Sequence, residues 1–319
     1  MAPSIQKVAI LGATGSVGSP ILSALLAEPS FSVTIITRTN SSASFPAGVP
    51  VKKISDAFTL SELTSVFRGH DAVVVALSTA PVTAGGGKDG LAFRLIDAAL
   101  AAGIKRFIPS EFGANNLDAR ARALVPTYDI KSNMLAYLQR VCASSNGSMT
   151  WSSICCGSWL DWALDPTKSG NFLGIDVKNR SATIFDSGAT RFAITTSTNT
   201  GLAVAKVLLN DDMTANKQIF LCDFLACTNE IVAALEQHTG EEFRVQNKDS
   251  KAEIKALRAR YDAGDANATY PLLALTFGAD VDVGYDFPAE QEVWNEKLGL
   301  PKAALGEVVK EAVELATRS

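Results

Sequence analysis

Three glycines follow an apolar run near the N-terminus, in the segment 7–18, which reads KVAILGATGSVG. Gly12 permits a sharp turn out of a strand, and Gly15 lets the backbone approach a phosphate with no Cβ in the way. Gly18 lets the next helix, which we expect to begin near Ser16, pack closely on the sheet, so that the helix dipole and its unpaired N–H groups point at the turn. The pattern predicts a dinucleotide-binding turn. Its expected cofactor contacts are Gly12, Thr14, Gly15, Ser16, Val17 and Gly18.

The residue that ends the second predicted strand, 31–37, favours a phosphorylated cofactor. An NAD-type site has an acidic residue there, about 20 residues past the glycines, to hold the ribose hydroxyls. This chain has Arg38 instead, followed by the polar run Thr39-Asn40-Ser41-Ser42. A guanidinium beside hydroxyl and amide groups suits the 2′-phosphate of NADP; the alternative is a surface arginine in solvent. Asp56 ends the third predicted strand, 51–54, where the adenine would lie.

Two serines follow the next predicted strands at the same edge of the sheet. Ser78 follows the apolar run 71–77, and Ser110 follows the strand 106–109. The carboxyl ends of parallel strands meet at one edge, where open α/β sheets bind their ligands. We therefore expect both serines near the cofactor, with 78–87 forming a flexible loop over it.

A lysine and a tyrosine lie three residues apart on a predicted helix, 127–143. Tyr128 and Lys131 therefore share one side of that helix, with Lys131 at the edge of its apolar stripe. From the residues alone, Lys131 is either an exposed helix lysine or an acid–base group, and Tyr128 either lines the substrate or packs in the core. Their spacing is not the Tyr-x-x-x-Lys of ordinary short-chain dehydrogenases.

The elements that must position these residues alternate regularly between strand and helix. Such alternation predicts an α/β fold, a Rossmann-type doubly wound parallel sheet with a smaller C-terminal α/β substrate domain. We place the NADP-binding domain at 1–157, with segments within about 190–228 able to return to it, and the substrate-binding domain at 158–319. Four aromatic residues of the second half are candidates for an aromatic pocket or for core: Trp159, Trp162, Phe172 and Phe192.

Composition and charge exclude several functional classes. A net charge of −4 argues against nucleic acid as the main partner, because no basic stripe is present to neutralise phosphates. The longest strongly apolar run, 72–77, is too short to cross a bilayer, so we expect no membrane partner and a cytoplasmic protein. Five cysteines without a CxxC pair and two histidines outside HExxH spacing predict no disulfide framework and no metal site.

The segment 105–113, KRFIPSEFG, together with the glycine turn, Arg38 and Lys131, resembles the NmrA-like, isoflavone reductase-like family of atypical short-chain dehydrogenases. The resemblance is specific over roughly the first 160 residues and holds only in outline beyond them. It implies that NADPH binds at the glycine turn and that Lys131 is catalytic. It also implies that Phe112 and the stretch from Gly157 to Trp159 border the nicotinamide and the substrate. Ala92 departs from the family pattern, in which many members carry glutamine.

Together with the residues, this resemblance implies an NADPH-dependent reductase of an aromatic or conjugated small molecule. Lys131 would assist the hydride transfer, and Phe112, Tyr128 and Trp159 would contact the substrate. We expect a monomer or homodimer, with a place in secondary metabolism. Two alternatives stay open: a noncatalytic NmrA-like redox sensor that binds a protein partner, and an isomerase or condensation enzyme that retains the cofactor without consuming it.

Overall fold

The computed structural model describes residues 4–84, 90–169 and 171–318. The chain forms two compact units, each built from several segments. Unit 1 comprises residues 1–112, 130–155 and 198–219, and unit 2 comprises residues 113–129, 156–197 and 220–319. Each unit is described by itself.

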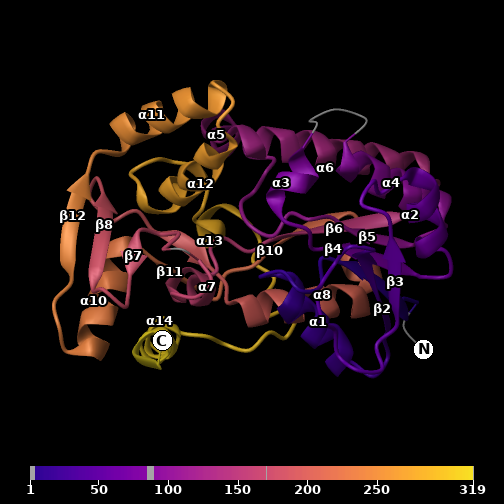
Figure 1. Ribbon diagram of the computed structural model, residues 1–319, viewed down its shortest axis with the longest axis horizontal. Coiled ribbons are helices and arrows are strands. Elements are labelled where there is room, and N and C mark those ends of the chain that lie inside the picture. Colours follow the sequence, from indigo (N-terminus) through magenta and orange to yellow (C-terminus); the bar gives the residue numbers. More distant parts are fainter. Residues whose placement is uncertain (1–3, 85–89, 170, 319) are drawn as a thin grey trace. The chain divides into compact units, whose positions relative to one another are not determined.

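A parallel sheet forms the centre of unit 1 (Figure 1), in the order β10-β6-β5-β4-β1-β2-β3. Its neighbours from β3 through β6 pair in parallel. The central strands β1 and β4 are apolar on both faces, as a sheet covered on both sides requires. The strand order reverses between β1 and β4, the point at which such sheets bind ligands. The strands are β1 (Lys7–Leu11), β2 (Ser32–Arg38), β3 (Val51–Ile54), β4 (Ala72–Val75), β5 (Arg106–Ile108), β6 (Thr150–Cys155) and β10 (Lys217–Phe220).

Helices cover both faces of this sheet, which confirms the predicted doubly wound α/β fold (Figure 1). Helices α1 and α8 share one face, where a Cβ on Gly201 would lie 2.4 Å from the Pro20 carbonyl oxygen. Helix α2 begins with a capping box between Thr59 and Glu62. The helices are α1 (Gly18–Ala27), α2 (Leu60–Phe67), α3 (Thr79–Thr83), α4 (Leu91–Ala101), α6 (Pro126–Ser144), α8 (Ser197–Leu209) and α9 (Asp211–Thr214).

Two local predictions for unit 1 need correction. Helix α1 begins at Gly18 rather than near Ser16, because Val17 is the N-cap residue. The segment after Ser78, predicted as a flexible loop, contains the short helix α3. Residues 85–87 of that predicted loop lie outside the described residues.

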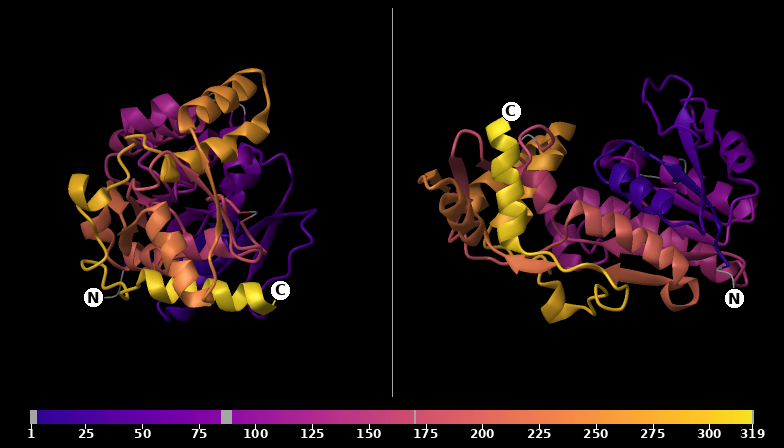
Figure 2. Two further views of the ribbon diagram at one scale, coloured as in Figure 1. Left: turned by 90° about the vertical axis from the view of Figure 1, so that its left-hand side faces the viewer. Right: turned by 90° about the horizontal axis from the view of Figure 1, so that it is seen from below.

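Unit 2 contains two small sheets and several helices. Strands β9 (Phe192–Ile194) and β11 (Phe224–Ala226) pair antiparallel. A second sheet has the order β12-β8-β7, with β8 (Ser181–Phe185) at its centre. The other strands are β7 (Ile175–Asp176) and β12 (Arg244–Lys248). Helix α14 packs against α10 (Figure 2). The helices are α5 (Ala119–Leu124), α7 (Leu160–Leu164), α10 (Thr228–Thr239), α11 (Ser250–Asp262), α12 (Thr269–Gly278), α13 (Phe287–Glu290) and α14 (Leu305–Arg318), with a 3-10 turn η1 (Ala266–Ala268).

None of the helices in the described ranges combines the length and the apolar character needed to span a bilayer.

Candidate functional site

The three glycines of the turn between β1 and α1 differ in how much space the surrounding protein leaves for a side chain. Gly12 has φ +80°, and a Cβ there would lie 2.3 Å from the Ala76 carbonyl oxygen. A Cβ on Gly18 would lie 1.9 Å from the Gly12 carbonyl oxygen. At Gly15, by contrast, the nearest protein atom would be 3.4 Å away. Protein packing therefore requires glycine at Gly12 and Gly18 but hardly at Gly15, so Gly15 leaves open a cradle of the kind that a phosphate uses.

The start of α1 presents the features of an anion site beside this cradle. Val17, the N-cap residue, makes no side-chain capping hydrogen bond. The first N–H groups of a helix have no intrahelical acceptor, and the helix dipole adds positive potential there. Thr14, Gly15 and Ser16 are exposed on the turn. The residues predicted from sequence are thus brought together in a geometry that fits a pyrophosphate.

Arg38 lies at the end of β2, beside the end of β3. Its side chain is 61% exposed, and its Nε lies 3.8 Å from Asp56 Oδ1. Asn40 Nδ2 donates to Asp56 Oδ2 at 2.6 Å. Arg38 is therefore open to a ligand, while Asp56, predicted to lie by the adenine, contacts Arg38 and Asn40.

A row of contacts joins the glycine turn to the ends of the neighbouring strands. Ala76, whose carbonyl oxygen crowds Gly12, donates its N–H to the Leu11 carbonyl oxygen at 2.9 Å. The next residue, Leu77, accepts a hydrogen bond of 2.6 Å from Ser110 Oγ. Ser110 is thus a residue that ties the loop after β5 to the loop after β4. The contacts follow the carboxyl ends of β1, β4 and β5, where a ligand of this fold binds.

Lys131 extends this row from helix α6. Its Nζ donates to the Glu111 carbonyl oxygen at 3.1 Å. Lys131 is only 7% exposed, which excludes the alternative of an exposed helix lysine and agrees with the expected position at the edge of the core. A buried ammonium adjoining the carboxyl ends of the strands can stabilise negative charge or move a proton.

The remaining predicted residues divide between the units. Ser78 is the exposed N-cap residue of α3, and Phe112 is buried in unit 1 with φ +39°. Gly157 and Trp159 belong to unit 2. A Cβ on Gly157 would lie 2.0 Å from the Ala193 carbonyl oxygen, so packing alone requires glycine at this position. The contacts of these four residues with a cofactor or substrate stay predictions.

Tyr128 begins a chain of buried hydroxyl groups in unit 2. Its hydroxyl lies 2.7 Å from the Tyr285 hydroxyl, which lies 2.9 Å from Thr276 Oγ1. Thr276 Oγ1 lies 2.6 Å from the Leu273 carbonyl oxygen. Because a carbonyl oxygen can only accept, Thr276 must donate there, Tyr285 must then donate to Thr276, and Tyr128 to Tyr285. The Tyr128 hydroxyl therefore donates its proton to Tyr285, and this proton is not available to a substrate while the chain of hydrogen bonds is intact.

Burial makes the phenols of Tyr128 and Tyr285 weaker acids than exposed tyrosines. It raises the pKa of Tyr128 to about 12 and the pKa of Tyr285 well above its ordinary value. Neither Tyr285 nor Thr276 was a predicted site residue. No local signal could have found them, because Tyr128 and Tyr285 are 157 positions apart in the sequence.

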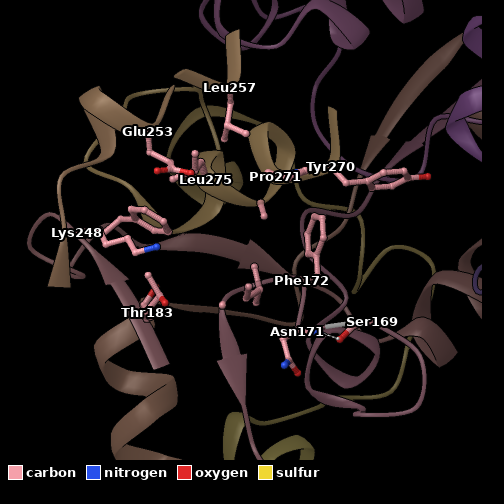
Figure 3. A pocket seen from close by; sticks show the side chains of 16 residues that line it. Ser169, Asn171, Phe172, Thr183, Lys248, Glu253, Leu257, Tyr270, Pro271 and Leu275 are labelled. Carbon is pink, nitrogen blue, oxygen red and sulfur yellow. Dashed lines mark hydrogen bonds between the residues drawn. The ribbon is translucent and has the colours of Figure 1, made fainter. Parts of the chain in front are cut away.

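A cavity of about 310 Å³ lies within unit 2 (Figure 3). Phe172, Leu275 and Pro271 supply apolar walls, and Lys248 and Thr183 supply polar groups. The Phe172 ring packs edge-on against Trp162, 5.4 Å between centroids. Of the predicted aromatic residues, Trp162 and Phe172 are therefore in contact, and Phe172 borders a space in which a small organic molecule could lie.

Clusters of potential metal ligands are absent from the part of the chain that the structure describes. No group of three or more histidine, cysteine, aspartate or glutamate side chains there could hold an ion. None of the five cysteines, which all lie in the described ranges, takes part in a disulfide bond. His70 and His238 each place Nδ1 within hydrogen-bond distance of a backbone carbonyl oxygen in their own local segment.

Comparison with known proteins gives this arrangement a context. Oxidoreductase aprR of Aspergillus flavus is 32% identical over 304 residues, covering 95% of this chain and 97% of that protein. Oxidoreductase poxI of Penicillium oxalicum is 32% identical over 319 residues, covering 98% and 96%. The leucoanthocyanidin reductase of Vitis vinifera in its binary complex with NADPH has a TM-score of 0.72, 20% identity, and coverage of 97% of this chain and 99% of that one.

The model of the NmrA-like family matches residues 4–256. That match spans both units and includes the glycine turn, Arg38 and Lys131. Together with the identity to two oxidoreductases along nearly the whole chain, it shows that this protein is an oxidoreductase belonging to the NmrA-like family.

Proposed function

We propose that this chain is an NADPH-dependent reductase that transfers a hydride to an aromatic or otherwise conjugated small molecule, with Lys131 as its catalytic residue. The observation that carries the proposal is the buried Lys131, held by the Glu111 carbonyl oxygen in the row of contacts that begins at the glycine turn. A noncatalytic cofactor sensor has no need of a buried ammonium at that place.

The cofactor assignment rests on the cradle at Gly15 and on Arg38. Gly15 is the glycine of the turn that packing does not require, so its missing Cβ serves an approaching phosphate. The exposed guanidinium of Arg38 can form charge-assisted hydrogen bonds with a 2′-phosphate, which NADPH has and NADH lacks. The NADPH in the leucoanthocyanidin reductase complex, a protein of the same fold, supports this choice.

The chemical role of Lys131 follows from charge. NADPH, when bound, supplies the hydride. A conjugated substrate that accepts a hydride at carbon gains negative charge on its oxygen, and the Lys131 ammonium can stabilise that charge or donate a proton to it. The hydrogen bond to the Glu111 carbonyl oxygen orients the amine for this task.

The aromatic character of the substrate is the finer part of the proposal. It is supported by the aromatic residues of unit 2, where Trp162 packs on Phe172 and Phe172 lines the cavity of Figure 3. An offset or edge-on aromatic ring gains additional stabilisation beside such side chains. A role in secondary metabolism is part of the same proposal.

The test is transfer of isotope. The protein would be incubated with NADPH carrying deuterium at either face of the nicotinamide C4 and with a panel of aromatic enones, quinone methides and benzylic ethers. Mass spectrometry should find deuterium in one product from one labelled face only. Lys131→Met should abolish most of the label while leaving NADPH affinity intact, and Lys206→Met on α8 is the matched lysine control.

Two results would contradict the proposal. Tight NADPH binding with no label in any compound would favour the sensor. An altered product that forms without consumption of NADPH would favour the isomerase or condensation enzyme.

A further inference from the structure

Phe112 has a backbone conformation that is unusual for a buried aromatic residue. Among the described residues other than glycine, seven have a positive φ, and Phe112, with φ +39°, is the only buried one. Four of the other six are asparagine or aspartate, which adopt this left-handed region more readily than a bulky residue does. A strained conformation of this kind is maintained only where the surrounding structure enforces it, and it is found most often at functional sites.

The φ angle of Phe112 sets the direction of the Glu111 carbonyl group. That carbonyl belongs to the planar peptide unit that joins Glu111 to Phe112, and φ of Phe112 is the rotation of this unit about the next N–Cα bond. With the rest of the chain in place, a change from +39° to an ordinary value of about −60° would rotate the peptide plane by roughly 100°. The carbonyl oxygen would then turn away from the Lys131 ammonium, which donates to it at 3.1 Å. The hydrogen bond of Lys131 therefore depends on the left-handed conformation of Phe112.

Contacts on both sides hold this peptide unit in place. Before it, Ser110 Oγ donates to the Leu77 carbonyl oxygen at 2.6 Å. The Glu111 N–H donates to the Pro109 carbonyl oxygen at 2.9 Å, which closes a three-residue turn around Ser110. After it, the Phe112 residue is only 6% exposed, so its side chain is held by packing. Because both ends are fixed, the remaining freedom of the peptide unit is its own rotation, and φ of Phe112 determines that rotation.

We propose that Phe112 is a positioning residue for Lys131. It acts through its backbone: the left-handed conformation turns the Glu111 carbonyl oxygen toward the ammonium and so fixes where the amine lies. A catalytic group that is misplaced by a small distance loses much of its effect, so the strain at Phe112 serves the reaction. This inference rests on the proposed function, because the position of Lys131 matters for catalysis only if Lys131 takes part in it. The hydrogen bond itself can be measured without a substrate.

The key variants are Phe112→Leu and Phe112→Ile. Leucine and isoleucine contain the same atoms, but only isoleucine is branched at Cβ, and a β-branched residue is strongly disfavoured at positive φ. Phe112→Ile should therefore drive the backbone out of the left-handed region and turn the Glu111 carbonyl away from Lys131, whereas Phe112→Leu should keep both in place. Phe58 has φ +47° and also belongs to unit 1, so Phe58→Leu and Phe58→Ile are the matched control for backbone strain alone.

Exchange of the Lys131 ammonium protons with water reports the hydrogen bond, and NMR of protein with 15N-labelled lysine measures it. Protons of a buried, hydrogen-bonded ammonium exchange slowly, and the Lys131 signal is identified by its absence from Lys131→Met. We expect exchange about tenfold faster in Phe112→Ile than in Phe112→Leu, because only the isoleucine variant loses the hydrogen bond. Phe58→Ile and Phe58→Leu should both keep the wild-type exchange rate. Melting temperatures should be lower for isoleucine than for leucine at both positions, since both sites require positive φ.

Equal exchange rates in Phe112→Ile and Phe112→Leu would overturn the proposal. Faster exchange in Phe58→Ile than in Phe58→Leu would also overturn it, because the effect would then come from a general loss of stability. If Phe112→Ile does not fold, Phe112→Asn takes its place, since asparagine adopts positive φ readily. The Lys131 protons of Phe112→Asn should exchange no faster than those of Phe112→Leu, and faster exchange would show that the apolar side chain, not the backbone, holds the lysine.

Turnover distinguishes this inference from the proposed function. With a substrate identified by isotope transfer, hydride transfer at saturating NADPH should be about tenfold slower in Phe112→Ile than in Phe112→Leu. Equal hydride-transfer rates in the two variants would overturn the role of Phe112 in the reaction. If proton exchange at Lys131 differs between the two variants as expected but the wild-type protein transfers no hydride, the proposed function alone is overturned.

Discussion

Unit 2 contains two sets of buried hydroxyl groups that differ in where their protons go. The chain from Tyr128 through Tyr285 to Thr276 donates each proton to the next member and ends on a backbone carbonyl. Ser158 and Thr195 are equally buried, yet their hydroxyls have no partner among the described residues. The first set is satisfied within the fold, and the second is left unsatisfied at a cost in stability.

The difference separates hydroxyls that stabilise the fold from hydroxyls whose hydrogen-bonding capacity the described residues leave unused. A satisfied network holds segments together, and its members cannot donate to a ligand unless the network is broken. Unsatisfied groups destabilise the free protein. Removing a hydroxyl of the first set should therefore lower the stability of the protein, whereas removing the hydroxyl of Ser158 or Thr195 should not.

The largest expected effect tests whether Tyr128 or Lys131 moves the proton. Both side chains project from helix α6, but the Tyr128 proton is donated to Tyr285. We expect Lys131→Met to slow hydride transfer by roughly 10²- to 10⁴-fold, the usual contribution of a positioned acid or base. Tyr128→Phe should slow it less than tenfold. Single-turnover oxidation of NADPH followed at 340 nm measures both.

The control for this pair is cofactor affinity, which both variants should keep within about a factor of three of wild type, well below the tenfold step that 1.4 kcal/mol represents. A Tyr128→Phe enzyme as slow as Lys131→Met would show that the hydroxyl chain reopens during the reaction. It would thereby remove the distinction between the two sets.

The second effect concerns the middle of the satisfied chain. Tyr285→Phe leaves the Tyr128 hydroxyl without its acceptor and Thr276 Oγ1 without a donor. We expect a loss of about 2–4 kcal/mol in the free energy of unfolding, because two buried groups lose their partners. Denaturant unfolding measures this loss. Tyr128→Phe, which removes only the first donor, should cost about 1 kcal/mol, and equal losses in the two variants would contradict the proton order.

The third effect is a loss of stability in alkali. Burial raises the folded-state pKa of Tyr128 to about 12, above the value of 10 in an unfolded chain. The stabilisation of the neutral phenol is therefore complete below pH 10 and is lost as the pH rises toward 12, because only the unfolded chain releases the proton in that window. Each pKa unit is worth about 1.4 kcal/mol. Tyr128 should contribute about 2–3 kcal/mol to the loss between pH 9.5 and 12, so the wild-type curve should fall by that much more than the Tyr128→Phe curve; parallel curves would contradict the role of this phenol.

Unit 1 was largely predictable because its residues are ordered by local rules. Alternating strands and helices, the glycine turn and the Thr59 capping box all depend on neighbours within a few positions. Unit 2 offered weaker signals. Helix α12, TYPLLALTFG, has apolar residues on all sides and a proline in its first turn, so no period marks it. Strand β12 is exposed at every residue and lacks the alternation that predicts a half-buried strand.

The candidate site shows the same division. Sequence placed Lys131 on a helix and Gly15 in a turn, but the burial of Lys131 depends on the loop after β5, 20 residues earlier. The partners of Tyr128 and the orphaned hydroxyl of Thr195 depend on contacts between distant segments. No rule of spacing reaches across the 157 positions between Tyr128 and Tyr285.

The smallest expected effect extends the comparison to the surface. Arg38 contributes little to the fold, since it is mostly exposed and its nearest carboxylate oxygen, on Asp56, lies 3.8 Å away. Arg38 should therefore affect cofactor affinity rather than stability. Arg38→Ala should weaken NADPH binding about tenfold and leave NADH binding within a factor of two, with no change in melting temperature. Asp56→Asn should have the opposite sign, because it removes a negative charge that competes with the 2′-phosphate for the guanidinium. Equal loss of NADPH and NADH affinity in Arg38→Ala would place the side chain on a group that the two cofactors share.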